Sequence, residues 1–213
     1  MAEASSIPAE QFDDLPQQHE AATLGMWTFL ATEILFFGGM FLSYVVYRHS
    51  YPEAFAAASK HTIVLFGTLN TAILLTSSLT MALAVHAAQE GNSKWTVRFL
   101  AITILLGLGF LAIKGLEYHE DFQEHLWPGR HFKTGLPPQA QIFWFLYWVM
   151  TGLHALHVTI GLGLLAVIAR MAARGRFSAQ YYNPVEITGL YWHFVDIVWI
   201  YLYPLLYLIN RFS

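Results

Sequence analysis

Five long runs of apolar residues, separated by short polar stretches, make up most of this chain. Lipid cannot hydrogen-bond to free backbone groups, so crossing a hydrocarbon core of roughly 30 Å takes about 20 mostly apolar residues in a helix. Each of the five runs is long enough for such a crossing. The pattern therefore predicts an all-α, polytopic membrane protein, a bundle of five transmembrane helices over Leu24–Tyr47, Thr62–His86, Thr96–Gly115, Ile142–Met171 and Ile187–Ile209.

The segments outside these runs predict no further folded domain. The connections are short and contain Pro and Gly, as interfacial loops do. Residues 1–23 contain no Lys or Arg and no apolar core, so they resemble neither a secretory signal nor an Arg-rich transit peptide. We expect an acidic, flexible N-terminal tail over residues 1–23 and a membrane domain over residues 24–213.

Composition supports the membrane assignment and limits the chemistry. Hydrophobic residues make up 56% of the chain and charged residues 12%, whereas soluble domains carry about a quarter charged residues. The formal charge of −3 and the lack of a basic stripe argue against a nucleic-acid partner. The chain has no Cys, which excludes disulfides, thiolate metal sites, iron–sulfur clusters and covalent c-type haem.

The orientation in the membrane rests on one basic cluster, because the total numbers of Lys and Arg in the loops and at the ends of the runs are equal on the two sides. Arg170, Arg174 and Arg176 lie close together after the fourth run, and positive loops stay cytoplasmic. The N-terminus is then cytoplasmic and the C-terminus lies on the outer, periplasmic side. We expect Arg170 and Arg174 to contact anionic lipid headgroups.

Glu33 lies near the middle of the first run. A charged group at this depth costs about 2.5–3.5 kcal/mol on insertion scales, so it faces a partner or a cavity. Two interpretations are open: a carboxyl that handles protons or contacts lipid, and a structural hydrogen bond between helices.

Histidine and aspartate occur in pairs in the last two runs. His193 and Asp196 are three residues apart and share a helical face, which suits a general base, a metal site or, more commonly, a hydrogen bond between helices. His154 and His157 have the same spacing, so both imidazoles are expected to face one neighbouring helix. A metal site there would need a third ligand, such as His193.

Other polar residues lie at or near the ends of the runs. Lys114 and Glu117 are expected to form an ion pair near the membrane interface. The acids at 117, 120, 121 and 124 form either a docking surface for a basic electron carrier or an ordinary solvated loop. Asn70, in the second run, suits a hydrogen bond between helices.

Five stretches, in order, resemble subunit III of cytochrome c oxidases. They are ATEILFFGGMF (31–41), LNTAILLTSS (69–78), KGLEYHE (114–120), TGLHALHVTIG (151–161) and YWHFVDIVWIYLY (191–203). The combination of HxxHVxxG with WHFVDxVW is highly specific. By this resemblance, the family's functional and structural positions are Glu33, Glu117, Glu120, His154, His157, Trp192, His193 and Asp196.

The resemblance implies an accessory subunit of an aerobic haem–copper oxidase in a bacterial inner membrane. Such a subunit has no catalytic residue and no metal of its own, because haem and copper belong to partner subunits. It packs against subunit I, beside subunit II and a small subunit IV, holds structural phospholipids and supports proton uptake by subunit I. Electrons arrive from cytochrome c or quinol through other subunits.

The oxidase type stays open. The long form of the family has seven helices, and this chain matches the last five, as the short subunit III of bacterial quinol oxidases does. The first motif, with its Glu33, is more similar to the cytochrome c oxidase branch of the family. Related five-helix proteins also accompany nitric oxide reductases. Two other functions remain open: a b-type haem protein that uses His154 or His157 with His193, and a transporter that uses Glu33 and Asp196. The sequence lacks the inverted repeats expected of a transporter.

Overall fold

Helices dominate the computed structural model, which describes residues 11, 14–130, 132–133 and 135–209. In that part of the chain the only strand-like pairing is a single bridge between Ser178 and Tyr181, so the all-α prediction is confirmed. The helices are α1 (Leu15–Ser50), α2 (Pro52–Ser59), α3 (Val64–Gln89), α4 (Ser93–Gln123), α5 (Ala140–Ala173), α6 (Asn183–Tyr203) and the π-helical turn η1 (Pro204–Leu208).

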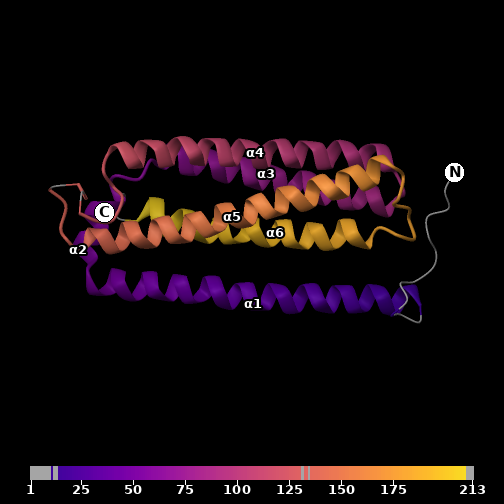
Figure 1. Ribbon diagram of the computed structural model, residues 1–213, viewed down its shortest axis with the longest axis horizontal. Helices are drawn as coiled ribbons and strands as arrows, with labels where there is room; N and C mark the ends of the chain where they lie inside the picture. Colours follow the sequence, from indigo (N-terminus) through magenta and orange to yellow (C-terminus); the bar gives the residue numbers. More distant parts are fainter. Residues whose placement is uncertain (1–10, 12–13, 131, 134, 210–213) are drawn as a thin grey trace.

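The long helices run along one common axis (Figure 1). α3 and α4 pack together on one side, α1 forms the opposite side, and α5 and α6 lie between them. α6 contacts α1, α3 and α5, whereas α1 reaches the long helices of the bundle through α5 and α6. The short α2 lies at the same end of the bundle as η1, which it contacts.

Four of the described helices, α1, α3, α4 and α5, are long and apolar enough to cross a membrane. The prediction of five spans is therefore not confirmed, because α6 falls outside this group. α6 carries Glu186, His193 and Asp196, and three helices surround it. Polar side chains on a helix inside a bundle are directed toward protein rather than lipid, so its lower hydropathy has a structural reason.

The first helix begins earlier than expected. The Asp14 carboxylate accepts a hydrogen bond from the backbone N–H of Gln17 (2.8 Å), and Pro16 occupies the first turn, two features that favour a helix start. The predicted boundary of the tail at residue 23 is wrong, because the chain is helical from Leu15 onward. The rest of the predicted tail, residues 1–10 and 12–13, lies outside the described residues.

The last predicted run, Ile187–Ile209, is not one regular helix. α6 ends at Tyr203 and continues as the π-helical turn η1, which begins at Pro204. Proline has no backbone N–H to continue the regular hydrogen-bond pattern. This change of helix type directs Tyr207 into the interior of the bundle, where it is fully buried.

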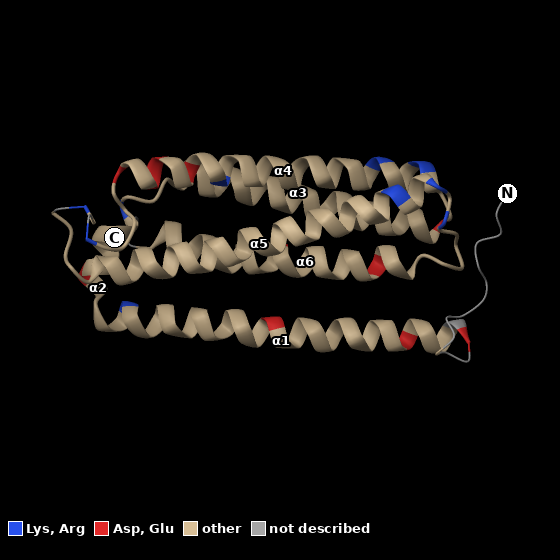
Figure 2. Cartoon of the chain, viewed as in Figure 1, with Lys and Arg blue, Asp and Glu red and all other residues tan. Residues whose placement is uncertain are grey.

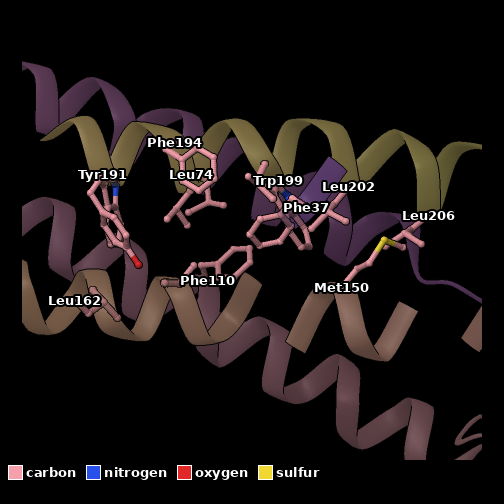
Figure 3. Packing of buried hydrophobic residues seen from close by; sticks show 14 of the residues in the cluster. Phe37, Leu74, Phe110, Met150, Leu162, Tyr191, Phe194, Trp199, Leu202 and Leu206 are labelled. Carbon is pink, nitrogen blue, oxygen red and sulfur yellow. The ribbon is translucent and has the colours of Figure 1, made fainter. Parts of the chain in front are cut away.

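Aromatic and aliphatic side chains together fill the core between the helices (Figure 3). The Phe110 and Trp199 rings, from α4 and α6, meet edge to face with centroids 4.9 Å apart. Phe37 brings α1 to the same core, with its ring 6.2 Å from that of Phe194. These rings connect helices that are distant in sequence.

Trp192 packs against two glycines. A Cβ atom at Gly107 would lie 2.8 Å from the Trp192 ring, and one at Gly161 would lie 2.9 Å from it. The indole N–H donates to the Ser77 hydroxyl of α3 (2.8 Å). Small residues allow close helix packing in membranes, and here they allow one buried indole to contact α3, α4 and α5.

Candidate functional site

Glu33 pairs with His157 across the α1–α5 contact. Glu33 Oε2 lies 3.2 Å from His157 Nε2, and the two side chains are 19% and 13% exposed. The edge of the Phe37 ring covers the imidazole, with centroids 5.3 Å apart. Sequence patterns do not predict this pairing, because the two residues lie in different motifs far apart in the chain.

The contacts of the His157 ring indicate where hydrogens are needed between it and Glu33. His157 Nδ1 lies 2.8 Å from the Leu153 carbonyl oxygen, which can only accept, so Nδ1 carries a hydrogen. Neutral imidazole then has no hydrogen on Nε2. The contact with Glu33 needs one hydrogen, either on the carboxyl or on an imidazolium, and the pair as a whole is neutral in both cases.

The other histidines face different helices. His154 Nε2 donates to the Val195 carbonyl oxygen of α6 (3.0 Å), and its ring packs against Phe110 and Trp199. His193 Nδ1 contacts the Ser78 hydroxyl of α3 (2.7 Å). The expectation that His154 and His157 face one neighbour is wrong, because a spacing of three residues separates them by about 60° around the helix, enough to place them on α6 and α1.

Two predicted polar residues are buried with little hydrogen bonding. Both Asp196 oxygens and both amide atoms of Asn70 lack a hydrogen-bond partner of standard geometry among the described residues, although the Ser78 hydroxyl is near enough to interact with Asp196. Asp196 and His193 do not hydrogen-bond to each other in this structure. His193 instead contacts Ser78 of α3, which agrees with the interpretation of His193 as a hydrogen-bonding residue between helices.

A second polar group lies at the end of α4. Lys114 Nζ donates to Glu117 Oε2 (3.1 Å), Tyr147 Oη (2.9 Å) and Tyr207 Oη (2.7 Å). Tyr207 donates to Glu117 Oε1 (2.7 Å), and Tyr147 Oη lies 2.9 Å from both Glu117 Oε1 and Asp121 Oδ2. We call these five residues the buried ionic cluster.

The predicted Lys114–Glu117 pair is confirmed, but its environment is not the expected one. Its side chains are 2% and 0% exposed, and Asp121 is buried as well. The acidic docking surface therefore loses Glu117 and Asp121, while Glu120 and Glu124 remain exposed. Positions 114, 117 and 121 follow the i, i+3, i+7 spacing of one helical face, and this spacing could have predicted that the three side chains lie together. No such sequence signal identifies Tyr147 and Tyr207 as their partners.

The loop after α4 is fixed by a surface contact. Lys133 Nζ donates to Glu124 Oε2 (2.7 Å), and His61 Nδ1 lies 3.7 Å from the same oxygen. The hydrogen bond from Lys133 holds the pKa of Glu124 below its ordinary value. Glu124 therefore serves as a loop contact in this structure.

Basic residues gather at the opposite end of the bundle (Figure 2). A cavity of about 320 Å³ lies between the start of α4 and the end of α5, lined by Lys94, Arg98, Ala172 and Ala173 among others. Arg170 and Arg174 are exposed at the same end of α5. The cluster predicted from Arg170, Arg174 and Arg176 thus lies at the same end of the bundle as Lys94 and Arg98 at the start of α4.

No three of the described His, Asp and Glu side chains converge in a way that could hold a metal ion. His154, His157 and His193 reach α6, α1 and α3 respectively. The geometry therefore does not favour a b-type haem ligated by His154 or His157 together with His193.

Comparison with known proteins identifies one family. Residues 15–211 match the family model described as cytochrome c oxidase subunit III. A cytochrome c oxidase subunit 3 from Thermostichus vulcanus is 32% identical over 201 residues, covering 94% of this chain and 93% of that protein. Proteins of the same name from Cyprinus carpio and Oncorhynchus mykiss are 32% and 33% identical, covering 90% of this chain and 71% of theirs. The chain therefore belongs to the cytochrome c oxidase subunit III family.

Proposed function

We propose that this chain is the accessory subunit III of an aerobic haem–copper oxidase that reduces oxygen to water and pumps protons. Family membership over residues 15–211 carries this proposal. The diverging histidines agree with a subunit that leaves haem and copper to its partners. Electrons from cytochrome c or quinol then enter through other subunits.

The proposed assembly places subunit I as the main contact, with subunit II and a small subunit IV nearby, in a bacterial inner membrane. α1 supports this arrangement, because it exposes large apolar side chains such as Leu24 (70%) and Leu35 (76%). An exposed apolar helix face in a membrane meets lipid or another subunit. α6 would be the fifth span: it packs against α1, α3 and α5, and Ile197, Ile200 and Tyr201 remain exposed on its free face.

Within this assembly, Glu33 and His157 would support proton uptake or lipid retention. The contact between Glu33 Oε2 and His157 Nε2 supports this role, since a carboxyl and an imidazole in hydrogen-bond contact can pass a proton between them without changing the net charge of the pair. Both side chains keep some exposure, so a lipid or a partner helix can reach them. Structural phospholipids are proposed along the same side of α1.

The replacement Glu33→Gln tests this role. Glutamine keeps the volume and a hydrogen for His157 Nε2 but cannot release a proton. We expect normal assembly with a lower initial rate of oxygen consumption, or a faster decay of that rate over many turnovers. The matched control is Glu20→Gln, an exposed residue of the same helix, which should change neither. Identical rates, decay and lipid content in the two variants would reduce Glu33 to a structural residue.

The basic end of the bundle should face the cytoplasm. Each basic residue near an anionic surface contributes about 1 kcal/mol, and this end holds Lys94, Arg98, Arg170 and Arg174. A cysteine introduced as Ala173→Cys, in a chain that has none, should stay unlabelled by a membrane-impermeant thiol reagent in intact cells and react after lysis. Labelling in intact cells would reverse the proposed orientation.

A further inference from the structure

If Lys114, Glu117 and Asp121 are all charged, the buried ionic cluster has one hydrogen-bond contact more than it has hydrogens to fill. We infer that the cluster binds one additional proton, and that this proton resides on Asp121 and is donated to Tyr147 Oη. Asp121 is then a proton-binding site buried among α4, α5 and η1, distinct from the Glu33–His157 pair.

Six contacts of 2.7–3.1 Å, three from nitrogen to oxygen and three between oxygens, join the side chains of the cluster. Three involve Lys114 Nζ, two join the tyrosine hydroxyls to Glu117 Oε1, and one joins Tyr147 Oη to Asp121 Oδ2. Each contact needs its own hydrogen. The ammonium supplies three and each hydroxyl supplies one, which makes five. Either Glu117 or Asp121 must supply the sixth.

The surroundings of the two carboxyls decide between them. Glu117 accepts a charge-assisted bond from Lys114 at 3.1 Å, as well as the Tyr207 hydroxyl, and these bonds favour its ionised form. Asp121 has no cation within salt-bridge distance among the described residues, and its described hydrogen-bond partner is Tyr147. A buried carboxyl without a cation is more stable protonated. The sixth hydrogen therefore belongs on Asp121.

The protonated cluster is electrically neutral, because the Lys114 ammonium balances the Glu117 carboxylate. The other groups that act on Asp121 are Tyr147 of α5, which bonds to it, and exposed Glu124, which follows α4 and whose charge disfavours a second carboxylate there. Loss of the proton would leave an unpaired negative charge and an unbridged contact between two oxygens. Occupancy of this site thus controls how firmly α5 is joined to the end of α4.

Infrared spectroscopy of the purified complex tests where the proton resides. In the spectrum of wild type minus Asp121→Asn, we expect a carboxylic-acid C=O band that moves to lower frequency when aspartate carries ¹³C in its side-chain carboxyl. A difference that contains only carboxylate bands would overturn the inference. A shift produced by ¹³C-labelled glutamate but not by labelled aspartate would overturn the placement on Asp121.

Assembly gives a second measurement that does not depend on spectra. Asparagine is neutral and offers an N–H to Tyr147 Oη, so Asp121→Asn should assemble as wild type does and should retain the subunit to a higher pH. Glu117→Gln keeps the shape but removes the charge that balances Lys114, so it should assemble less well. A neutral Asp121 would be contradicted if Asp121→Asn assembled less well than Glu117→Gln. It would also be contradicted if the Asp121→Asn subunit dissociated at a lower pH than the wild-type subunit.

Discussion

Replacing Lys114 with methionine is expected to prevent stable incorporation of this subunit into the oxidase. The Lys114 side chain is 2% exposed and supplies three of the six hydrogens in the buried ionic cluster. Without it, Glu117 keeps a negative charge in a fully buried position. Breaking a buried ion pair by removing one partner costs about 3–5 kcal/mol, a large part of the stability of an ordinary protein.

The measurement is the amount of this chain that copurifies with the oxidase, together with its melting temperature in detergent. A double variant, Lys114→Met with Glu117→Gln, separates charge from shape. If the loss comes from the unpaired charge of Glu117, the double variant should assemble better than Lys114→Met alone. Equal losses in both would mean that the lysine acts through packing against the neighbouring tyrosines, and the electrostatic explanation would be wrong.

Gly161→Ala is the second variant for which we expect a large effect. The new Cβ atom would lie 2.9 Å from Trp192 Cε3 and Cζ3 and 3.1 Å from Tyr191 Cε1. Trp192 is fully buried and is held by its bond to Ser77, so it cannot move aside freely. Overpacking of this kind costs about 1–3 kcal/mol, and the melting temperature of the assembled complex should fall.

Gly163→Ala provides the matched control. This glycine lies in the same helix, and a Cβ atom there meets nothing within 4 Å. Because alanine favours a helix over glycine by about 1 kcal/mol, the control should match or exceed wild type in melting temperature. Equal effects at both positions would show that the Trp192 contact does not limit packing.

The apolar runs predicted the positions of all five long helices. Four runs lie within or close to α1, α3, α4 and α5, and Ile187–Ile209 coincides with α6 and η1, because a helix that crosses a membrane needs about 20 mostly apolar residues. α6 falls outside the four described helices that are apolar enough to be candidate spans, since it carries Glu186, His193 and Asp196. The start of α1 was missed, because a cap at Asp14 lies outside the apolar run on which the prediction rested.

The sequence identified the residues of the polar sites, but for most of them it did not identify the partner residue. Glu33 and His157 were both singled out, yet nothing in either motif identifies the other as its neighbour. Lys114 and Glu117 were paired correctly because helical spacing alone places them together. The tyrosines that complete the buried ionic cluster come from α5 and η1, and only the folded chain brings them to α4.

Polar contacts with the rest of the bundle also determine the position of α1 along its own axis. Three polar side-chain contacts tie it to the bundle at separate depths: His19 to Glu186 of α6, Glu33 to His157 of α5, and Tyr44 to the Leu205 carbonyl of η1. A shift of α1 by one turn, about 5.4 Å, would break all three of them. The depth of Glu33 in the bilayer is therefore set in part by residues near the two membrane surfaces.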